Sequence, residues 1–201
     1  MTSQRDVWIR EVGTRDGLQS IDTILTTEVK LHWIEQEALS GIPEIEVGSF
    51  VPPKLLPQMA DTAKVVEGAL SFKKLKVSVL VPNFRGAIDA MASGAHQLNY
   101  VLSVSEAHSQ SNVRKSVHEA IDDFEKILKK DTVIFGNLPY NISTQILLKL
   151  IKISVWPPEY FKLILMFQKE VAERILAKYN TANYGRLSIV SNWRLKIIDH
   201  F

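Results

Sequence analysis

The chain has 201 residues, of which 46% are hydrophobic and 23% charged, the balance of a globular protein with a sizeable core and not of a disordered chain. It contains no cysteine, which excludes a disulfide scaffold, cysteine-ligated zinc and a cysteine nucleophile. No stretch approaches the ~20 consecutive apolar residues of a membrane span, and the N-terminus has no apolar signal core. We therefore expect a cytoplasmic protein that makes no membrane contact.

The net charge of +2 is unevenly distributed along the chain. Residues 1–130 hold 15 basic and 17 acidic side chains, whereas residues 131–201 hold 9 basic and 5 acidic ones. The first part resembles a neutral metabolic domain. The second part is compatible with an anionic partner, although many ordinary surfaces carry the same charge.

Strand and helix patterns alternate along the whole chain. In the first part we expect strands over 7–12, 44–47, 75–81 and 97–103, and helices over 26–40, 57–71, 87–93 and 111–130. In the second part we expect strands over 132–135, 160–167 and 194–201, and helices over 143–153 and 169–178. Strands separated by helices predict βαβ units and a parallel sheet.

The first candidate site follows the first strand directly, in residues 12–19 (VGTRDGLQ). Sites of parallel α/β folds lie at the carboxyl ends of strands. There Asp16 could ligate a hard divalent cation, and Arg15 could hold a carboxylate or enolate oxygen. Glu46 lies in the second strand, and if it is buried it needs a partner, for which Arg15 is the obvious choice. The alternatives are a surface salt bridge in a glycine-flanked turn and a solvent-facing Glu46.

A resemblance to a known family rests on several ordered motifs. They are residues 11–19 (EVGTRDGLQ), 45–54 (IEVGSFVPPK), 57–61 (PQMAD), 81–86 (VPNFRG) and 105–108 (SEAH). Over residues 7 to about 128, the chain resembles the N-terminal half of hydroxymethylglutaryl-CoA lyase. The resemblance implies a metal-dependent (β/α)₈ barrel that cleaves an acyl-CoA by a retro-aldol (Claisen-type) reaction. It implies Asp16 as a ligand of Mg²⁺ or Mn²⁺, Arg15 as the group that stabilises the enolate, and Glu46 as the residue that orders Arg15.

The sequence departs from this family at two points. The family's other metal ligands include a His-x-His pair, and none of the five histidines of this chain forms such a pair. The catalytic cysteine loop of the family is missing too, since the chain has no cysteine. We therefore expect the lyase chemistry to be incomplete in this chain alone.

The second candidate site is residues 136–141 (GNLPYN), which follow the strand expected over 132–135. The Asn137 amide could accept a hydrogen bond from an exocyclic amine, and the Tyr140 ring could stack on a flipped base. The alternative is an ordinary turn between strand and helix, with Tyr140 in the core and Asn141 or Ser143 capping the helix.

A second resemblance rests on residues 136–144, 165–175 (LMFQKEVAERI) and 183–188 (NYGRLS). Residues 132–201 resemble the middle of a ribosomal RNA adenine dimethyltransferase. The resemblance implies a target-adenine motif made of Asn137, Leu138, Pro139 and Tyr140, with S-adenosylmethionine as methyl donor and ribosomal RNA as partner. The family's glycine-rich donor loop would precede this segment, where lyase-like sequence stands instead.

Together these patterns predict an α/β fold in which half of a TIM-type barrel is continued by part of a Rossmann-like methyltransferase sheet. We expect a lyase-like half barrel of four βα units over 1–130 and a methyltransferase-like βαβα segment over 131–201, joined near 129–131. The added strands could extend the first sheet, or a second copy of the chain could cover its open edges. Three functions remain open: an acyl-CoA lyase fragment, an RNA adenine methyltransferase fragment, and a chimera without catalytic activity.

Overall fold

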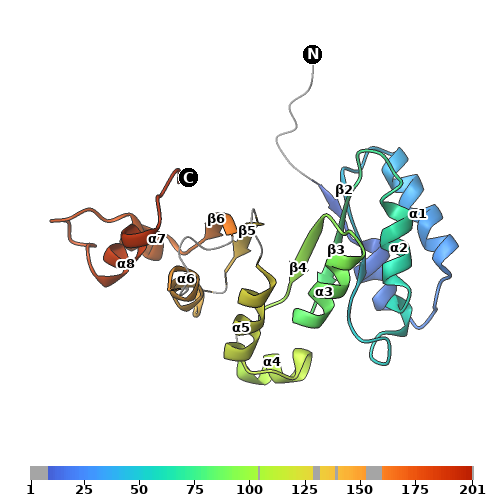
Figure 1. Ribbon diagram of the computed structural model, residues 1–201, viewed down its shortest axis with the longest axis horizontal. Helices are drawn as coiled ribbons and strands as arrows, with labels where there is room; N and C mark the ends of the chain where they lie inside the picture. The colour runs from blue at the N-terminus through green and yellow to red at the C-terminus, as the bar shows by residue number, and fades with distance from the viewer. Residues whose placement is uncertain (1–8, 104, 129–131, 139, 153–159, 201) are drawn as a thin grey trace, which may run out of the picture. The chain divides into compact units, whose positions relative to one another are not determined.

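The structure is a computed structural model that describes residues 9–103, 105–128, 132–138, 140–152 and 160–200 (Figure 1). The chain divides into two compact units, Met1–Leu102 and Ser103–Phe201. The join expected near residues 129–131 lies outside the described residues. Within the described part of the chain, no helix has the length and apolar character needed to cross a bilayer.

The first unit is built on a parallel sheet of four strands in the order β1-β2-β3-β4. The strands are β1 (Arg10–Glu11), β2 (Glu44–Ser49), β3 (Lys76–Val81) and β4 (Gln97–Tyr100). They alternate with the π-helical turn η1 (Gly13–Gly17), α1 (Thr27–Leu39), the 3₁₀ turn η2 (Pro57–Met59), α2 (Thr62–Ala69) and α3 (Phe84–Ala92). The predicted parallel α/β architecture is confirmed. Residues 7 and 8 of the first expected strand lie outside the described residues.

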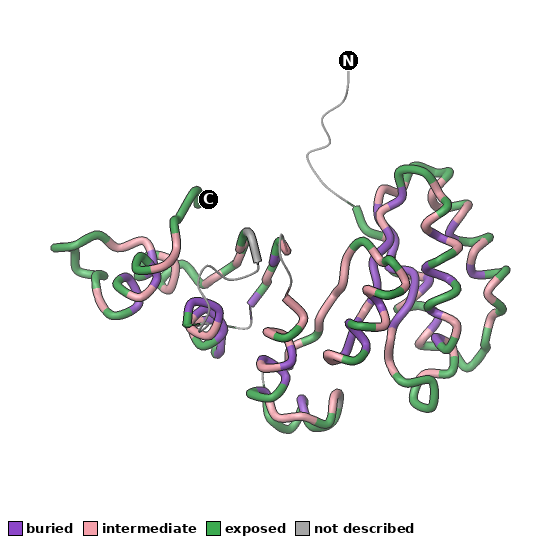
Figure 2. The backbone as a smooth tube through the Cα atoms, in the orientation of Figure 1, coloured by how far each residue is buried: buried purple, intermediate pink, exposed green. Residues whose placement is uncertain are grey.

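An apolar core forms between this sheet and its helices. In Figure 1, α1 and α2 run alongside each other, and α2 packs against β2. Buried positions are concentrated on β2 and β3 (Figure 2). The apolar side chains of this unit that are at most 1% exposed are Ile34, Ile45, Val47, Val65, Val66, Ala69, Val77, Val79, Val81, Ala87 and Ala90. This burial is the main favourable term for the unit.

A β-bulge interrupts the pairing of β2 with β3. Glu46 lies opposite Ser78, but Gly48 lies opposite Val79, so that Val47 is the extra residue. After the bulge, Ser49 lies opposite Leu80. Because residues two apart on β3 share a face, the bulge places Ser49 on the same face of the sheet as Glu46.

The second unit contains a separate parallel pair of strands, β5 (Thr132–Asn137) and β6 (Tyr160–Met166). Among the residues of this unit that the structure describes, five helices accompany them: α4 (Glu106–Val113), α5 (Val117–Ile127), α6 (Ser143–Ile151), α7 (Lys169–Leu176) and α8 (Arg186–Arg194). Leu147, Ile151, Ile175 and Leu187 form a buried cluster that joins α6, α7 and α8. The strands therefore do not extend the four-stranded sheet, which was one of the two arrangements left open by the sequence.

The single long helix expected over 111–130 is wrong. Two helices, α4 and α5, stand there, and Arg114 ends α4 in the left-handed conformation with φ 54°. Ser116 then starts α5 with a capping box, in which its side chain accepts from the Glu119 N–H and the Glu119 carboxylate accepts from the Ser116 N–H. The S-x-x-E signature was visible in the sequence.

The strand expected over 194–201 is also wrong. Helix α8 covers residues up to Arg194, and residues 195–200 have no regular structure. A strand needs the backbone of another strand to pair with, and none of the described strands pairs with this segment. The hydroxyl of Ser188 ties α8 to α7 by donating to the Arg174 carbonyl at 2.6 Å.

We predict that Gly48→Ala destabilises the protein by about 1–3 kcal/mol, because a Cβ there would lie 2.7 Å from Oγ1 and 2.8 Å from Cγ2 of the buried Thr62. Urea unfolding followed by circular dichroism measures the change. Gly17→Ala is the matched control, because no atom lies within 4 Å of the place that its Cβ would take. Equal unfolding free energies for the two variants would contradict the tight packing at Gly48.

Candidate active site

The turn η1 presents the Arg15-Asp16 pair at the end of β1. The Glu11 carboxylate holds the start of the turn, since its Oε1 accepts from the N–H groups of Val12 at 2.8 Å and Gly13 at 2.6 Å. The N–H groups of Arg15 and Asp16 both donate to the Val12 carbonyl, at 3.0 and 2.7 Å. The backbone of the turn is thus fixed from both sides, and its position after the strand matches the expectation.

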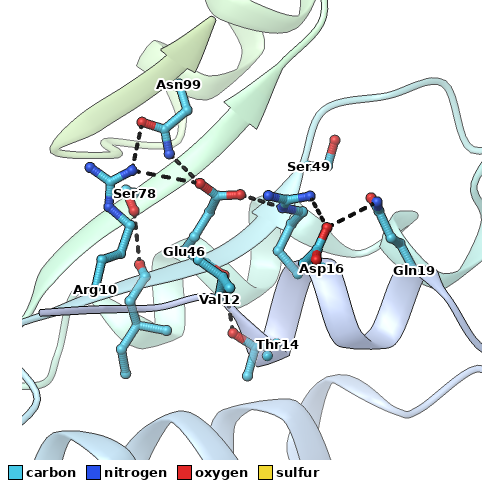
Figure 3. Close-up of polar contacts among 12 residues, drawn as sticks. Arg10, Val12, Thr14, Asp16, Gln19, Glu46, Ser49, Ser78 and Asn99 are labelled. Atoms are coloured by element: carbon cyan, nitrogen blue, oxygen red, sulfur yellow. Dashed lines mark hydrogen bonds and ion pairs between the residues drawn. The ribbon is translucent and has the colours of Figure 1, made fainter. Parts of the chain in front are cut away.

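Arg15 and Glu46 form an ion pair (Figure 3). The Nε of Arg15 donates a hydrogen bond to Oε1 of Glu46. Glu46 is only 3% exposed, and the Arg15 side chain is 14% exposed. The hydroxyl of Thr14 donates to the Glu46 carbonyl at 3.1 Å, which adds a second link between η1 and β2. The expected pairing of a buried Glu46 with Arg15 is therefore confirmed, and the alternative of a solvent-facing Glu46 is wrong.

Asp16 lies at the open end of this cluster. Its side chain is 58% exposed, and its Oδ1 accepts from Nη1 of Arg15 at 2.7 Å and from Nε2 of Gln19 at 3.4 Å. Arg15 thus lies between a buried carboxylate and an exposed one. This arrangement holds the guanidinium in one orientation, and the Arg15 side chain remains 14% exposed.

Three residues of the cluster were not predicted from the sequence. Arg10 binds Oε1 of the buried Glu44 through Nε at 2.5 Å, and its Nη1 donates to Oδ1 of Asn99 at 3.2 Å. The Nδ2 of Asn99 donates to Oε2 of Glu46. The available signal was the pair of polar side chains Gln97 and Asn99, which stand at alternating positions of a strand that lies next to a buried strand.

Ser49 is a further polar group on this face of the sheet. It is 1% exposed, and its hydroxyl has no hydrogen-bond partner among the described residues. Its backbone is held by Thr62, whose Oγ1 lies 3.3 Å from the Ser49 nitrogen and 3.0 Å from its carbonyl oxygen. Its placement depends on the bulge at Val47, which periodicity in the sequence does not reveal.

The second candidate site lies in the other compact unit. Asn137 is the last residue of β5 and is exposed, and Tyr140 is 63% exposed. Leu138 is only 8% exposed, and Pro139 lies outside the described residues. The alternative with Tyr140 in the core is wrong. Neither Asn141 nor Ser143 caps α6, because Ile142 occupies the cap position without a side-chain hydrogen bond.

Two family models match the chain. Residues 6–135 match the model described as HMGL-like, and residues 105–198 match the model described as ribosomal RNA adenine dimethylase. The two matches overlap over residues 105–135. The resemblance therefore changes from the first family to the second within this segment and not at a single residue.

Curated relatives and a solved structure agree with the first match. The chain is 41% identical over 128 residues to the mitochondrial hydroxymethylglutaryl-CoA lyase of Bos taurus, which covers 64% of this chain and 39% of the relative. It is 39% identical over 122 residues to the cytoplasmic 3-hydroxy-3-methylglutaryl-CoA lyase of Rattus norvegicus, covering 61% and 36%. A solved HMG-CoA lyase from Acinetobacter baumannii, in complex with coenzyme A and 3-methylmalate, superposes with a TM-score of 0.58 at 37% identity, covering 63% of this chain and 42% of that one. The chain thus spans about two fifths of the length of the lyases that it matches.

Glu37 of α1 lies next to the turn that carries the site. Burial raises the pKa of its carboxyl, the hydrogen bond from Trp33 Nε1 at 2.6 Å lowers it in part, and the negative charge of Glu11 raises it further. The second oxygen of Glu37 has no partner among the described residues. Ionised Glu37 is therefore less favourable in the folded state than in the unfolded chain.

We predict that Glu37→Gln stabilises the protein at about pH 7 and has no effect at about pH 4, near the ordinary range of carboxyl pKa values. Because the folded-state pKa is raised, the stability contributed by protonated Glu37 is complete below the unfolded pKa and is lost as the pH rises through the folded pKa. Solvent screening keeps the gain below about 1 kcal/mol. Urea unfolding at both pH values measures it, with Glu67→Gln on α2 as control; an unchanged stability at neutral pH would refute it.

Proposed function

The chain belongs to the HMGL-like family, and on that basis we propose that it binds an acyl-CoA and performs chemistry of the hydroxymethylglutaryl-CoA lyase type, with Arg15 as the catalytic residue, Glu46 as the residue that orders Arg15, and Asp16 beside them. The observation that carries the proposal is the orientation of Arg15. Its guanidinium is held between the buried Glu46 and the exposed Asp16, and its side chain remains 14% exposed.

In the proposed reaction, the tertiary hydroxyl of hydroxymethylglutaryl-CoA gives its proton to a water molecule and the bond between C2 and C3 breaks. The electron pair of that bond moves onto the thioester and forms an enolate, and the other fragment, acetoacetate, keeps the new ketone. A proton from water then adds to the enolate at C2 and gives acetyl-CoA. Arg15 stabilises the negative charge on the enolate oxygen, which is the kind of preorganised electrostatic effect that usually contributes most to catalysis.

The hydroxymethylglutaryl-CoA lyases depend on a divalent metal, which the resemblance places on Asp16 as Mg²⁺ or Mn²⁺. Among the described residues, no group of three or more His, Cys, Asp or Glu side chains could hold a metal ion. Asp16 alone supplies a carboxylate, and its Oδ1 is shared with Arg15 and Gln19. One exposed carboxylate does not fit a resident cation, so no step of the proposed reaction passes through a metal.

We predict that Arg15→Met slows the exchange of the C2 protons of acetyl-CoA with D₂O by about 10²–10³-fold, the loss typical of removing one oxyanion-stabilising donor. Proton NMR of acetyl-CoA follows this partial reaction. Arg85→Met is the matched control, because the Arg85 side chain is 85% exposed on α3 and pairs only with Asp89 among the described residues. An equal exchange rate in Arg15→Met and the unsubstituted chain would refute the proposal.

Three further expectations remain proposals. The outer strands β1 and β4 have no further strand partner within the described part of the chain, which supports pairing with a second copy at these edges. The division into a lyase-like segment over 1–130 and a methyltransferase-like segment over 131–201, and thus a chimeric origin, rests on the two resemblances. Some of the lyases matched are named as cytoplasmic and others as mitochondrial, which leaves the cytoplasmic location a proposal.

An adenine-binding role of Asn137, Leu138, Pro139 and Tyr140, with S-adenosylmethionine and ribosomal RNA as partners, is the second candidate, and the comparisons favour the lyase over it. The exposure of Asn137 and Tyr140 at one strand end supports it. Leu138 is buried and therefore contributes to the shape of the turn and not to a contact with a base.

We predict that Asn137→Ala weakens binding of an adenosine-containing RNA oligonucleotide by roughly tenfold, the effect of losing one hydrogen bond to a base. Fluorescence anisotropy of a labelled RNA measures binding. Asn192→Ala on α8 is the control, because the Asn192 amide donates within its own helix to the Ser188 carbonyl. Absence of RNA binding by the unsubstituted chain would remove this candidate.

A further inference from the structure

We propose that Asn99 is a positioning residue for the Arg15 site: it fixes the Glu46 carboxylate, which in turn orients the Arg15 guanidinium. The inference rests on the proposed function for its catalytic consequence but on the hydrogen bonds alone for its structural part. The hydrogen bonds of the Asn99 side chain go to Arg10, Gln97 and Glu46, and not to Arg15 or Asp16, so it acts through Glu46.

The orientation of the Asn99 amide is determined by its partners. Its Oδ1 accepts from Nη1 of Arg10 at 3.2 Å and from Nε2 of Gln97 at 3.3 Å. Both partners can only donate through these groups, so the carbonyl oxygen of the amide has to face them. The Nδ2 group therefore faces Glu46, where it donates to Oε2.

Arg10 is itself anchored, which makes the arrangement rigid. Its Nε lies 2.5 Å from Oε1 of Glu44, a residue that is 2% exposed, and Lys76 Nζ lies 3.9 Å from the other oxygen of Glu44. Arg10 Nη1 also lies 3.9 Å from Oε2 of Glu46. The Arg10 guanidinium thus interacts with the buried carboxylates of both Glu44 and Glu46, and it contacts Glu46 mainly through the Asn99 amide.

The two oxygens of Glu46 consequently have different partners. Oε2 accepts the hydrogen bond from Asn99, and Oε1 accepts the hydrogen bond from Nε of Arg15. Arg15 uses Nε for Glu46 and Nη1 for Asp16, so among the described residues Nη2 remains as the donor for a ligand oxygen. If Asn99 cannot donate a hydrogen bond, the Glu46 carboxylate is free to turn toward Arg10. Arg15 then loses the hydrogen bond that orients the plane of its guanidinium.

The direct test is the NMR signal of the Arg15 Nε–Hε group in the full chain. We expect Asn99→Leu, which keeps the approximate shape but removes donor and acceptor, to shift this signal upfield and to speed the exchange of Hε with water by about tenfold or more, as expected for weakening a charge-assisted hydrogen bond. Asn99→Asp, which cannot donate when ionised, should do the same.

Ser78→Ala is the matched structural control. Ser78 lies on the same face of the sheet and donates to the Ile45 carbonyl at 3.2 Å, a hydrogen bond that does not involve the Glu46 carboxylate. The substitution should lower stability and leave the Arg15 signal unchanged. An unchanged signal in Asn99→Leu, or an equal change in Ser78→Ala, would overturn the inference, since either would mean that Asn99 only helps to hold the sheet together.

The catalytic consequence is measured by the C2 proton exchange of acetyl-CoA. We expect Asn99→Leu to lower kcat about tenfold with KM unchanged, and to lower it no further in a Glu46→Gln background. A KM effect alone, or full additivity of the two substitutions, would contradict a role through Glu46. If the unsubstituted chain shows no exchange, the proposed function fails, while the Arg15 signal still decides the structural part.

Discussion

The burial of the Glu46 carboxylate is the constraint on which the rest of the first unit depends. A carboxylate that is 3% exposed is stable as an ion only with close cations and hydrogen-bond donors around it. Arg15 reaches it from η1 and Asn99 from β4, while Thr14 binds the backbone of the same residue. One buried charge therefore ties together the turn after β1, the central strand β2 and the outer strand β4.

The two faces of the four-stranded sheet are stabilised by different forces. The face that meets the helices is apolar, and its Ile45, Val77 and Val79 are fully buried. The opposite face carries Glu44, Glu46 and Asn99 together with Arg10, and these groups neutralise and satisfy one another. Removing one member leaves a buried group unpaired, which costs more than the pair itself contributes. The same groups that stabilise this face thus define the orientation of Arg15.

The contacts of this arrangement that depend on only two residues could be predicted from the sequence. A glutamate in a buried strand needs a cation, and Arg15 in the turn after the neighbouring strand was the available one, so their pairing was predictable. Asn99 was not, because its role depends on the register of β4 against β3 and on the reach of Arg10 across β2. The position of Ser49 was not predictable either, since one extra residue in β2 moves it to the other face.

The division of the chain into two compact units agrees with the pairing of the strands more closely than with the extent of the lyase-like match. The lyase-like match continues to residue 135, yet β5 pairs with β6 across the single helix α6 and not with β4. Two helices, α4 and α5, separate β4 from β5, whereas one crossover helix connects each neighbouring pair within a βαβ unit. Every member of the Arg15 network, from Arg10 to Asn99, belongs to the unit Met1–Leu102. The geometry of the proposed enolate site is therefore set within that unit, whichever activity residues 103–201 support.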